Sequence, residues 1–335
     1  MEIQVQELLS DFLRAASVTV DDTGLEIRLE RLLDDAASSS AVLKRDMRHL
    51  LEKNPAGFLK SACRMLKVSS QRPGVVSMLD LLWSTPVLLS SLIDPSMLPL
   101  SSAIAFARRW VAFDPMLDIK LLAIGYPSGA TFGDVAIDAA GSKRALEIVS
   151  ELPPNRHILQ PLARLLRSTD AYVRSKAALM YARGSDNPEW VRKMLADTDV
   201  GVRANAVEGL WGTKAASARS VFKEAALDRD HRVRVNGLLG SSFSGDREVD
   251  VQAALLGMAG MSNPTVRAAA AFAMGKIMDA VYVPILDGLI KDAEGQVRRQ
   301  ALQALISIRR NNRRDDTRSQ PAELLTVPEV AAEPV

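Results

Sequence analysis

A short pattern centred on arginine recurs five times in the C-terminal half of this 335-residue chain. In each copy an acidic residue or Asn lies four positions before the arginine, Val directly precedes it, and Ala or Gly follows three positions later. The central residues are Arg174, Arg203, Arg234, Arg267 and Arg298, at intervals of 29, 31, 33 and 31 residues. Self-similarity at a near-constant period of this length is typical of repeat architectures, so it constrains the fold more than any single motif does.

The spacing of apolar residues inside each copy is helical. Relative to the arginine, apolar or small side chains occur at −1, +3 and often +7, as in Val202, Ala206 and Leu210, which places them on one helix face. A second amphipathic segment precedes each copy, at residues 158–166, 190–195, 221–227, 251–258 and 283–290. Each repeat is therefore predicted to be a helical hairpin that must stack on its neighbours, and the fold class is all-α, a solenoid of stacked hairpins. The small residue at +3 predicts a close approach between neighbouring helices.

The Asp…Val-Arg-x-x-Ala unit resembles HEAT repeats, and its short period is similar to that of the bacterial variety first named from phycobilin lyases. The resemblance covers residues 152–310 and implies a right-handed α-solenoid whose Arg-bearing helices line the concave side. It also implies that an acidic residue of one unit pairs with a nearby arginine, so that the pairs form a ladder along the array. The implied ladder residues are Asp170, Arg174, Asp199, Arg203, Asp230, Arg234, Arg267, Asp292 and Arg298. The pattern is broken at Asn263 and in the fifth unit, where Asp292 or Glu294 would have to serve.

The rest of the chain divides by composition and turn residues. Residues 1–124 lack the Val-Arg signature but are predicted to be helical, as diverged repeats or a cap, and residues 125–133 form a turn-rich boundary. Residues 134–310 hold the repeat array, with five clear repeats from residue 152, and residues 311–335 are predicted to be a disordered tail. Helix starts are predicted where a capping residue precedes proline, at 54–55, 94–95, 114–115, 187–188 and 263–264.

Composition and charge indicate the compartment and the classes of partner. One cysteine suits a reducing cytosol, and neither a secretory signal nor an uninterrupted apolar span of about 20 residues is found, so a cytoplasmic protein without a membrane partner is predicted. Residues 152–314 carry 25 basic and 16 acidic side chains, which keeps nucleic acid open as a partner. The basic cluster at 309, 310, 313 and 314 is interpreted as complementing the dipole at the end of the last helix, with an anionic surface as the alternative.

Catalytic and metal-binding patterns are not found. The sequence has no Gly-x-Ser-x-Gly elbow and no P-loop, and its three His residues are widely separated. Cys63 lies on an apolar helix face and is interpreted as a small buried hydrophobe. We therefore predict a protein that is not an enzyme, with no catalytic residue, no metal and no cofactor.

The helix geometry predicts where a partner would bind. If offsets −1, +3 and +7 pack inward, offsets +2, +5 or +6 and +9 face the concave surface. The predicted partner-binding residues are Lys176, Leu179, Arg183, Asn205, Glu208, Asn236, Leu239, Phe243, Phe272, Lys276, Gln300 and Gln303. The alternative is that Leu239 and the two Phe residues complete the core.

These observations favour a scaffold or adaptor that binds another protein along its concave face. A mixture of amides, scattered charges and a few large apolar groups suits a protein surface better than a phosphate backbone, which calls for a denser basic stripe. Nucleic-acid binding by the basic repeat half is the first alternative. An accessory role on another protein, chaperone-like or lyase-like, is the second and is implied only by the resemblance.

Overall fold

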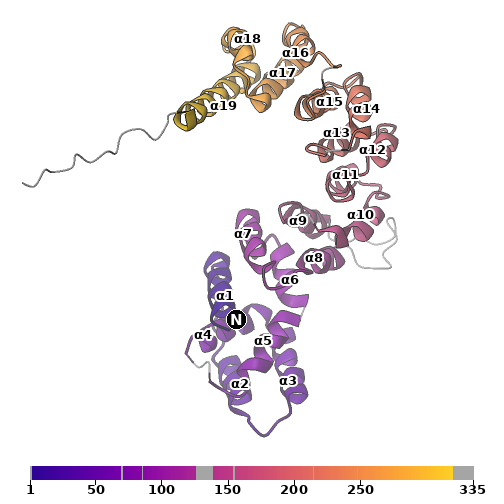
Figure 1. The fold of residues 1–335 in the computed structure, drawn as a ribbon. Helices are drawn as coiled ribbons and strands as arrows, with labels where there is room; N and C mark the ends of the chain where they lie inside the picture. Colours follow the sequence, from indigo (N-terminus) through magenta and orange to yellow (C-terminus); the bar gives the residue numbers. More distant parts are fainter. Residues whose placement is uncertain are drawn as a thin grey trace, which may run out of the picture. The chain divides into compact units, whose positions relative to one another are not determined.

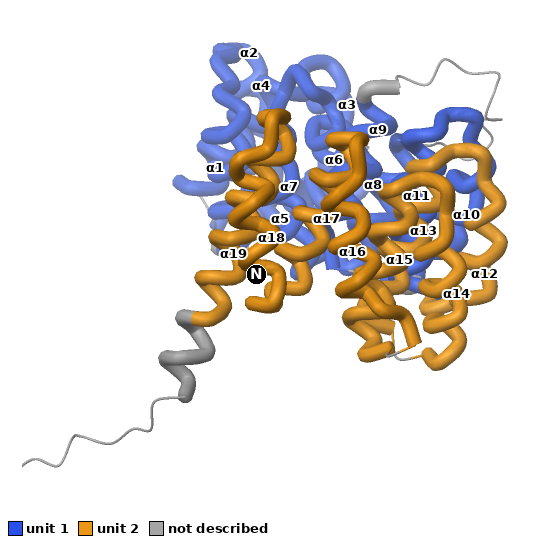
Figure 2. Tube along the Cα trace, turned by 90° about the horizontal axis from the view of Figure 1, so that it is seen from above, with its two compact units in different colours: residues 1–185 blue, residues 186–335 orange. Residues whose placement is uncertain are grey.

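The structure is a computed structural model that describes residues 2–68, 71–84, 86–125, 139–153, 155–213, 215–246 and 248–319. Every regular element in these ranges is a helix, which confirms the predicted all-α class. The contacts within the chain define two compact units, residues 1–185 (unit 1) and residues 186–335 (unit 2), coloured separately in Figure 2. None of the described helices combines the length and the apolar character that crossing a bilayer requires.

Unit 1 contains a continuous series of helices, several of which follow one another as antiparallel neighbours (Figure 1). In chain order these are α1 (Glu2–Ala16), α2 (Thr23–Asp34), α3 (Ser40–Lys53), α4 (Pro55–Val68), α5 (Val75–Ser84), α6 (Pro86–Ile93), α7 (Leu100–Trp110), α8 (Leu117–Gly125), α9 (Ala139–Ser150), the 3₁₀ turn η1 (Arg156–Ile158), α10 (Leu159–Leu165) and α11 (Ala171–Ser185).

Unit 2 holds the last four copies of the arginine pattern, each at the start of the second helix of a hairpin. Its helices are α12 (Pro188–Met194), α13 (Val200–Gly209), α14 (Ser217–Ala225), α15 (His231–Phe243), α16 (Val251–Ala259), α17 (Pro264–Ile277), the 3₁₀ turn η2 (Ala280–Tyr282), α18 (Val283–Leu289) and α19 (Gly295–Ser319).

The four hairpins of unit 2 are stacked. The second helices contact one another in sequence, α13 with α15, α15 with α17 and α17 with α19, while α12 contacts α14 and α16 contacts α18. The Arg-bearing helices therefore form one layer and the first helices of the hairpins form the other (Figure 1). This is the arrangement that short hairpins need, since each one alone cannot bury its apolar face.

The small residues at +3 lie where the helices approach most closely. Ala206, Ala270 and Ala301 are completely buried, and Gly237 of α15 packs against the backbone of α14. A Cβ added at Gly237 would lie 2.5 Å from the backbone nitrogen of Ala226. Backbone atoms of a neighbouring helix cannot yield as a flexible side chain can, so the hairpin of α14 and α15 requires glycine at this position.

Gly237→Ala should therefore lower the free energy of unfolding by about 1–3 kcal/mol, in spite of the better helix propensity of alanine. Gly257→Ala is the matched control, because Gly257 lies in α16 with nothing within 4 Å of the added Cβ. That substitution should stabilise the protein by up to about 1 kcal/mol. Urea unfolding followed by circular dichroism measures both, and equal effects of the two variants would contradict the close packing.

Unit 1 is held by a large apolar core that runs through its helices. Trp110 is fully buried, and its ring lies 4.9 Å from that of Trp83 and 5.4 Å from that of Phe106, whose ring in turn lies 5.0 Å from that of Phe12. These aromatic contacts join α1, α5 and α7. Cys63 is also buried, and desolvation raises the pKa of its thiol to about 12, as expected for a cysteine that serves only packing.

Three of the five predicted Asx-Pro helix starts coincide with helix N-termini. The side-chain oxygens of Asn54, Asn187 and Asn263 accept backbone N–H groups in the first turns of α4, α12 and α17. Asp94 and Asp114 also accept N–H groups two residues later, but in turns that precede α7 and α8. The same local hydrogen bond starts a helix or closes a turn, and the residues that follow decide which.

The predicted segment boundaries differ from the observed ones. Apart from Gly125, the turn-rich boundary at 125–133 lies outside the described residues. The division of the chain into compact units falls between Ser185 and Asp186. Helix α19 continues to Ser319, beyond the predicted end at 310, and residues 320–335 lie outside the described residues. Residues 311–319 contain no apolar period, but no Gly or Pro interrupts the sequence between 296 and 320, so the helix has no local reason to stop.

The longer helix changes the interpretation of the basic cluster. Arg309 and Arg310 are exposed and lie more than two turns before the end of α19. The helix dipole acts only within the last turn, so these two residues do not complement it. The side chains at 313 and 314 lie outside the described set.

Candidate functional site

The repeat arginines join loops to helices. Arg203 of α13 is 3% exposed, and its Nη1 donates to the carbonyl oxygens of Asp197 and Thr198 at 3.0 and 3.3 Å. These carbonyls lie just beyond α12, where a helix end leaves acceptors without partners. On its other edge Arg203 donates from Nε and Nη2 to both carboxylate oxygens of Asp228, at 3.0 and 3.2 Å. One side chain thus links its own hairpin to the next.

Arg267 of α17 repeats this geometry one junction later. Its Nη1 donates to the carbonyls of Met261 and Ser262, and its Nε and Nη2 donate to the carboxylate of Asp292 at 2.7 and 2.8 Å. Arg298 makes the same loop contacts, with the carbonyls of Asp292 and Ala293. In unit 1, Arg174 likewise donates to the carbonyls of Ser168 and Thr169.

Of the four acidic residues of the implied ladder, Asp292 pairs with Arg267, and the other three lie at helix starts. Asp199 and Asp230 are N-caps, which accept the N–H groups of Val202 and Arg232, and Asp170 accepts the N–H groups of Tyr172 and Val173 in the same way. The carboxylates that meet the arginines stand two residues earlier, at Asp228 and Asp292.

The sequence analysis included Asp292 in the ladder but missed Asp228, although the sequence carries a signal for this position. Asp197-x-Asp199 and Asp228-x-Asp230 repeat the same spacing, and the earlier Asp accepts the N–H of the later one, at 2.8 and 2.7 Å. The N-cap Asp230 binds the first turn of its own helix. Asp228, two positions earlier, lies in the loop and binds Arg203 of the preceding hairpin.

In these ion pairs, each charged group shifts the pKa of its partner. The hydrogen bonds with Asp228 raise the pKa of Arg203, and Arg203 lowers the pKa of Asp228 although burial opposes this. Arg267, helped by the N–H of Glu294, lowers the pKa of Asp292 to about 2. The folded state therefore holds the Asp292 proton more weakly than the unfolded chain does, and the interaction stabilises the fold at pH values above the ordinary Asp pKa.

Asp292→Asn should reduce the free energy of unfolding at pH 7, and this deficit should shrink as the pH falls from about 4 towards 2, because the native carboxylate is then protonated as well. Urea unfolding at a series of pH values measures the difference between the two proteins. Asp287→Asn, which removes an exposed carboxylate from α18, controls for the loss of charge alone. A deficit that does not depend on pH would contradict an ionic role for Asp292.

Arg234 of α15 is the exception among the arginines. Its Nε is buried and has no hydrogen-bond partner among the described residues. The position two residues before the next N-cap, Asn263, holds Met261 rather than Asp. The junction between α15 and α17 therefore lacks the ion pair that joins α13 to α15 and α17 to α19 through Asp228 and Asp292.

Met261→Asp should supply the missing partner and raise the free energy of unfolding by up to about 1 kcal/mol. A double-mutant cycle with Arg234→Leu tests whether the gain depends on the arginine. The coupling should disappear at high salt, because the new pair is partly exposed. An equal gain in the Arg234→Leu background would show that the stabilisation comes from elsewhere.

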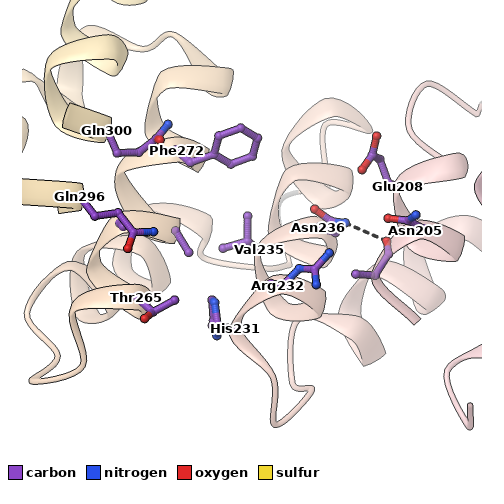
Figure 3. A pocket seen from close by; sticks show the side chains of 13 residues that line it. Asn205, Glu208, His231, Arg232, Val235, Asn236, Thr265, Phe272, Gln296 and Gln300 are labelled. Carbon is purple, nitrogen blue, oxygen red and sulfur yellow. Dashed lines mark hydrogen bonds between the residues drawn. The ribbon is translucent and has the colours of Figure 1, made fainter. Parts of the chain in front are cut away.

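A groove crosses the four Arg-bearing helices of unit 2 (Figure 3). Its volume is about 380 Å³. We call it the four-helix groove, because α13, α15, α17 and α19 all contribute to its lining. The lining residues are Ala204, Asn205, Glu208, His231, Arg232, Val235, Asn236, Thr265, Ala268, Ala269, Phe272, Gln296 and Gln300.

Side-chain amides recur in register along the groove. Asn205, Asn236 and Gln300 all lie two residues after a repeat arginine, and Gln296 lies two residues before one. Asn236 is itself a structural link, since its Nδ2 donates to the carbonyl of Ala204 in the neighbouring helix at 2.8 Å (Figure 3). Phe272 supplies the largest apolar surface, with the ammonium of Lys276 5.4 Å from its ring centre.

Five of the predicted partner-binding residues line the four-helix groove: Asn205, Glu208, Asn236, Phe272 and Gln300. Leu239 is completely buried, so it belongs to the core, as the alternative interpretation allowed. Phe243 is 46% exposed and packs edge-on against Trp211 outside the lining, with ring centres 5.6 Å apart.

The remaining predicted residues do not line this groove. Lys276 and Gln303 are exposed on α17 and α19. Lys176, Leu179 and Arg183 lie on α11 in unit 1, where Leu179 is buried and Arg183 is exposed.

The sequence analysis missed one column of the groove. Arg232, Thr265 and Gln296 each lie two residues before a repeat arginine, and all three line it. Offset −2 is one helical turn from +2, so the same periodicity that selected +2 also selects −2.

Comparison with known proteins identifies the repeat. Residues 237–306 match the family of HEAT repeats, and the match does not distinguish the phycobilin-lyase type within it. No curated protein matches the sequence.

Two solved structures align with most of this chain. Human deoxyhypusine hydroxylase in complex with glycerol is 14% identical, with 86% of this chain and 98% of that chain covered and a TM-score of 0.33. An engineered protein is 16% identical, with 91% and 99% covered and a TM-score of 0.35.

Proposed function

We propose that this chain, whose residues 237–306 match the family of HEAT repeats, is a non-enzymatic scaffold that binds an extended segment of a partner protein in the four-helix groove. The observation that carries the proposal is the row of side-chain amides two residues after the arginine in three of the four repeats, at Asn205, Asn236 and Gln300. An amide both donates and accepts hydrogen bonds, as the peptide groups of an extended chain do.

The lining has room for a partner segment. Alanines at 204, 268 and 269 leave space beside the amides. Phe272 offers an apolar surface for a partner side chain, which suits the mixture of polar and apolar groups found at protein interfaces.

The charges of the groove favour a peptide over nucleic acid. Arg232 and Glu208 are its only permanently charged lining residues, joined by His231. A phosphate backbone would call for several cations in a row. The basic excess of residues 152–314 keeps nucleic acid as the alternative, and the accessory role on another protein remains a special case of partner binding.

A displayed library of random 12-residue peptides, selected on the purified full chain, tests the proposal. The affinities of the enriched peptides are then measured on Phe272→Ala/Gln300→Ala, and they should be weaker by about tenfold or more. Phe243→Ala removes an exposed Phe outside the groove and should leave the affinities unchanged. Thermal unfolding of each variant verifies that it folds.

Two outcomes would contradict the groove as the site. The first is equal binding of the enriched peptides to the native chain and to Phe272→Ala/Gln300→Ala. The second is a failure to enrich any peptide while single-stranded DNA or RNA binds with a steep salt dependence, which would transfer the proposal to nucleic acid.

A further inference from the structure

Unit 1 contains a larger cavity, between α2 and α3, on elements that do not contribute to the four-helix groove. Its volume is about 590 Å³, which is within the range of ligand sites. Leu32 and Leu50 give it an apolar surface. We call it the α2–α3 pocket; the two helices pack against each other near the N-terminal end of the chain (Figure 1).

Basic side chains line the pocket around this apolar surface. Arg28 and Arg31 lie one turn apart on α2, and Arg45 and His49 lie one turn apart on α3; all four line the pocket and are exposed. The one carboxylate in the lining, Asp46, is already paired with the Nε of Arg45 at 3.0 Å.

Arg28 and Arg31 are free to bind an anion. Neither has an ion-pair partner among the described residues, whereas Arg108 on α7 pairs with Glu151 at 2.7 Å. Three of the four acids nearest to them in the sequence have other partners: Glu26 pairs with Arg64, Asp34 pairs with Arg72 at 3.3 Å, and Asp35 accepts the N–H groups of Ala37 and Ser38. The fourth, Glu30, lies on α2 between the two arginines and does not line the pocket.

The sequence around the pocket contains more acidic than basic side chains. Residues 1–151 carry 19 acidic and 16 basic side chains, so carboxylates were available to neutralise the pocket. Like charges held close together repel one another, and an anionic ligand would relieve that repulsion. The charge of the pocket therefore points to a ligand that carries carboxylates or phosphates.

The apolar part of the pocket favours a carboxylate-bearing peptide over a phosphate. A phosphate group would pair with the arginines but would leave the half-buried Leu32 in contact with water. A peptide with a large apolar residue flanked by Glu or Asp satisfies both features, because its side chain covers the leucines and its carboxylates form charge-assisted pairs with the guanidinium groups.

We propose that the α2–α3 pocket binds an acidic peptide segment, with carboxylates on Arg28 and Arg31 and a large apolar side chain against Leu32 and Leu50. The pocket is a second binding site, and it does not depend on the function of the four-helix groove.

The test uses the full chain and fluorescein-labelled pools of 10-residue peptides in which Glu flanks a central Leu, Ile, Phe or Met. Fluorescence anisotropy should show saturable binding that weakens with salt. Arg28→Gln/Arg31→Gln should weaken it by about tenfold or more, because two charge-assisted contacts are lost. Pools with Gln in place of Glu, or with Ala at the centre, should bind at least about tenfold more weakly.

Arg48→Gln/Lys53→Gln is the matched control, since it removes the same two charges from exposed positions of α3 outside the pocket. This variant should bind the acidic pool as the native chain does. If both double variants lost affinity equally, binding would depend only on the net charge of the protein, and the proposed site would be wrong. Absence of binding by the acidic pool, with phosphatidylserine vesicles bound in an Arg28- and Arg31-dependent manner, would overturn the peptide as the ligand.

Discussion

The guanidinium groups of Arg203 and Arg267 each make contacts on two sides. One edge satisfies carbonyls beyond the end of the first helix of its own hairpin, and the other forms a bidentate pair with an aspartate of the next hairpin. The planar fork of arginine fits both partners at once, which a lysine could not do. These pairs fix the register of α13 on α15 and of α17 on α19.

That register produces the four-helix groove. With Ala206, Ala270 and Ala301 buried at the helix contacts, the second helices pack closely and in phase, so residues at equal offsets from the arginine line up across repeats. Asn205, Asn236 and Gln300 form one such row. The binding surface is thus a consequence of the same periodicity that stabilises the stack.

The groove also crosses the junction where the register is least constrained. The hairpins of α15 and α17 pack through an apolar cluster but lack an ion pair, and the Nε of Arg234 is buried without a partner. Apolar packing is less directional than a bidentate ion pair, so this junction has the most freedom to adjust its spacing. Lining residues lie on both sides of it, including Asn236 on one and Phe272 on the other.

The sequence by itself determined the helical class, the position of each arginine helix and the close contacts at +3, because periodicity and small side chains act locally along a helix. It also identified five lining residues of the groove from their helix face. Only the tertiary structure decided that Asp228, and not Asp230, meets Arg203, that Leu239 is core, and that Arg28 and Arg31 of α2 share a pocket with Arg45 of α3. Those outcomes depend on the distance and rotation between helices, which no single helix encodes.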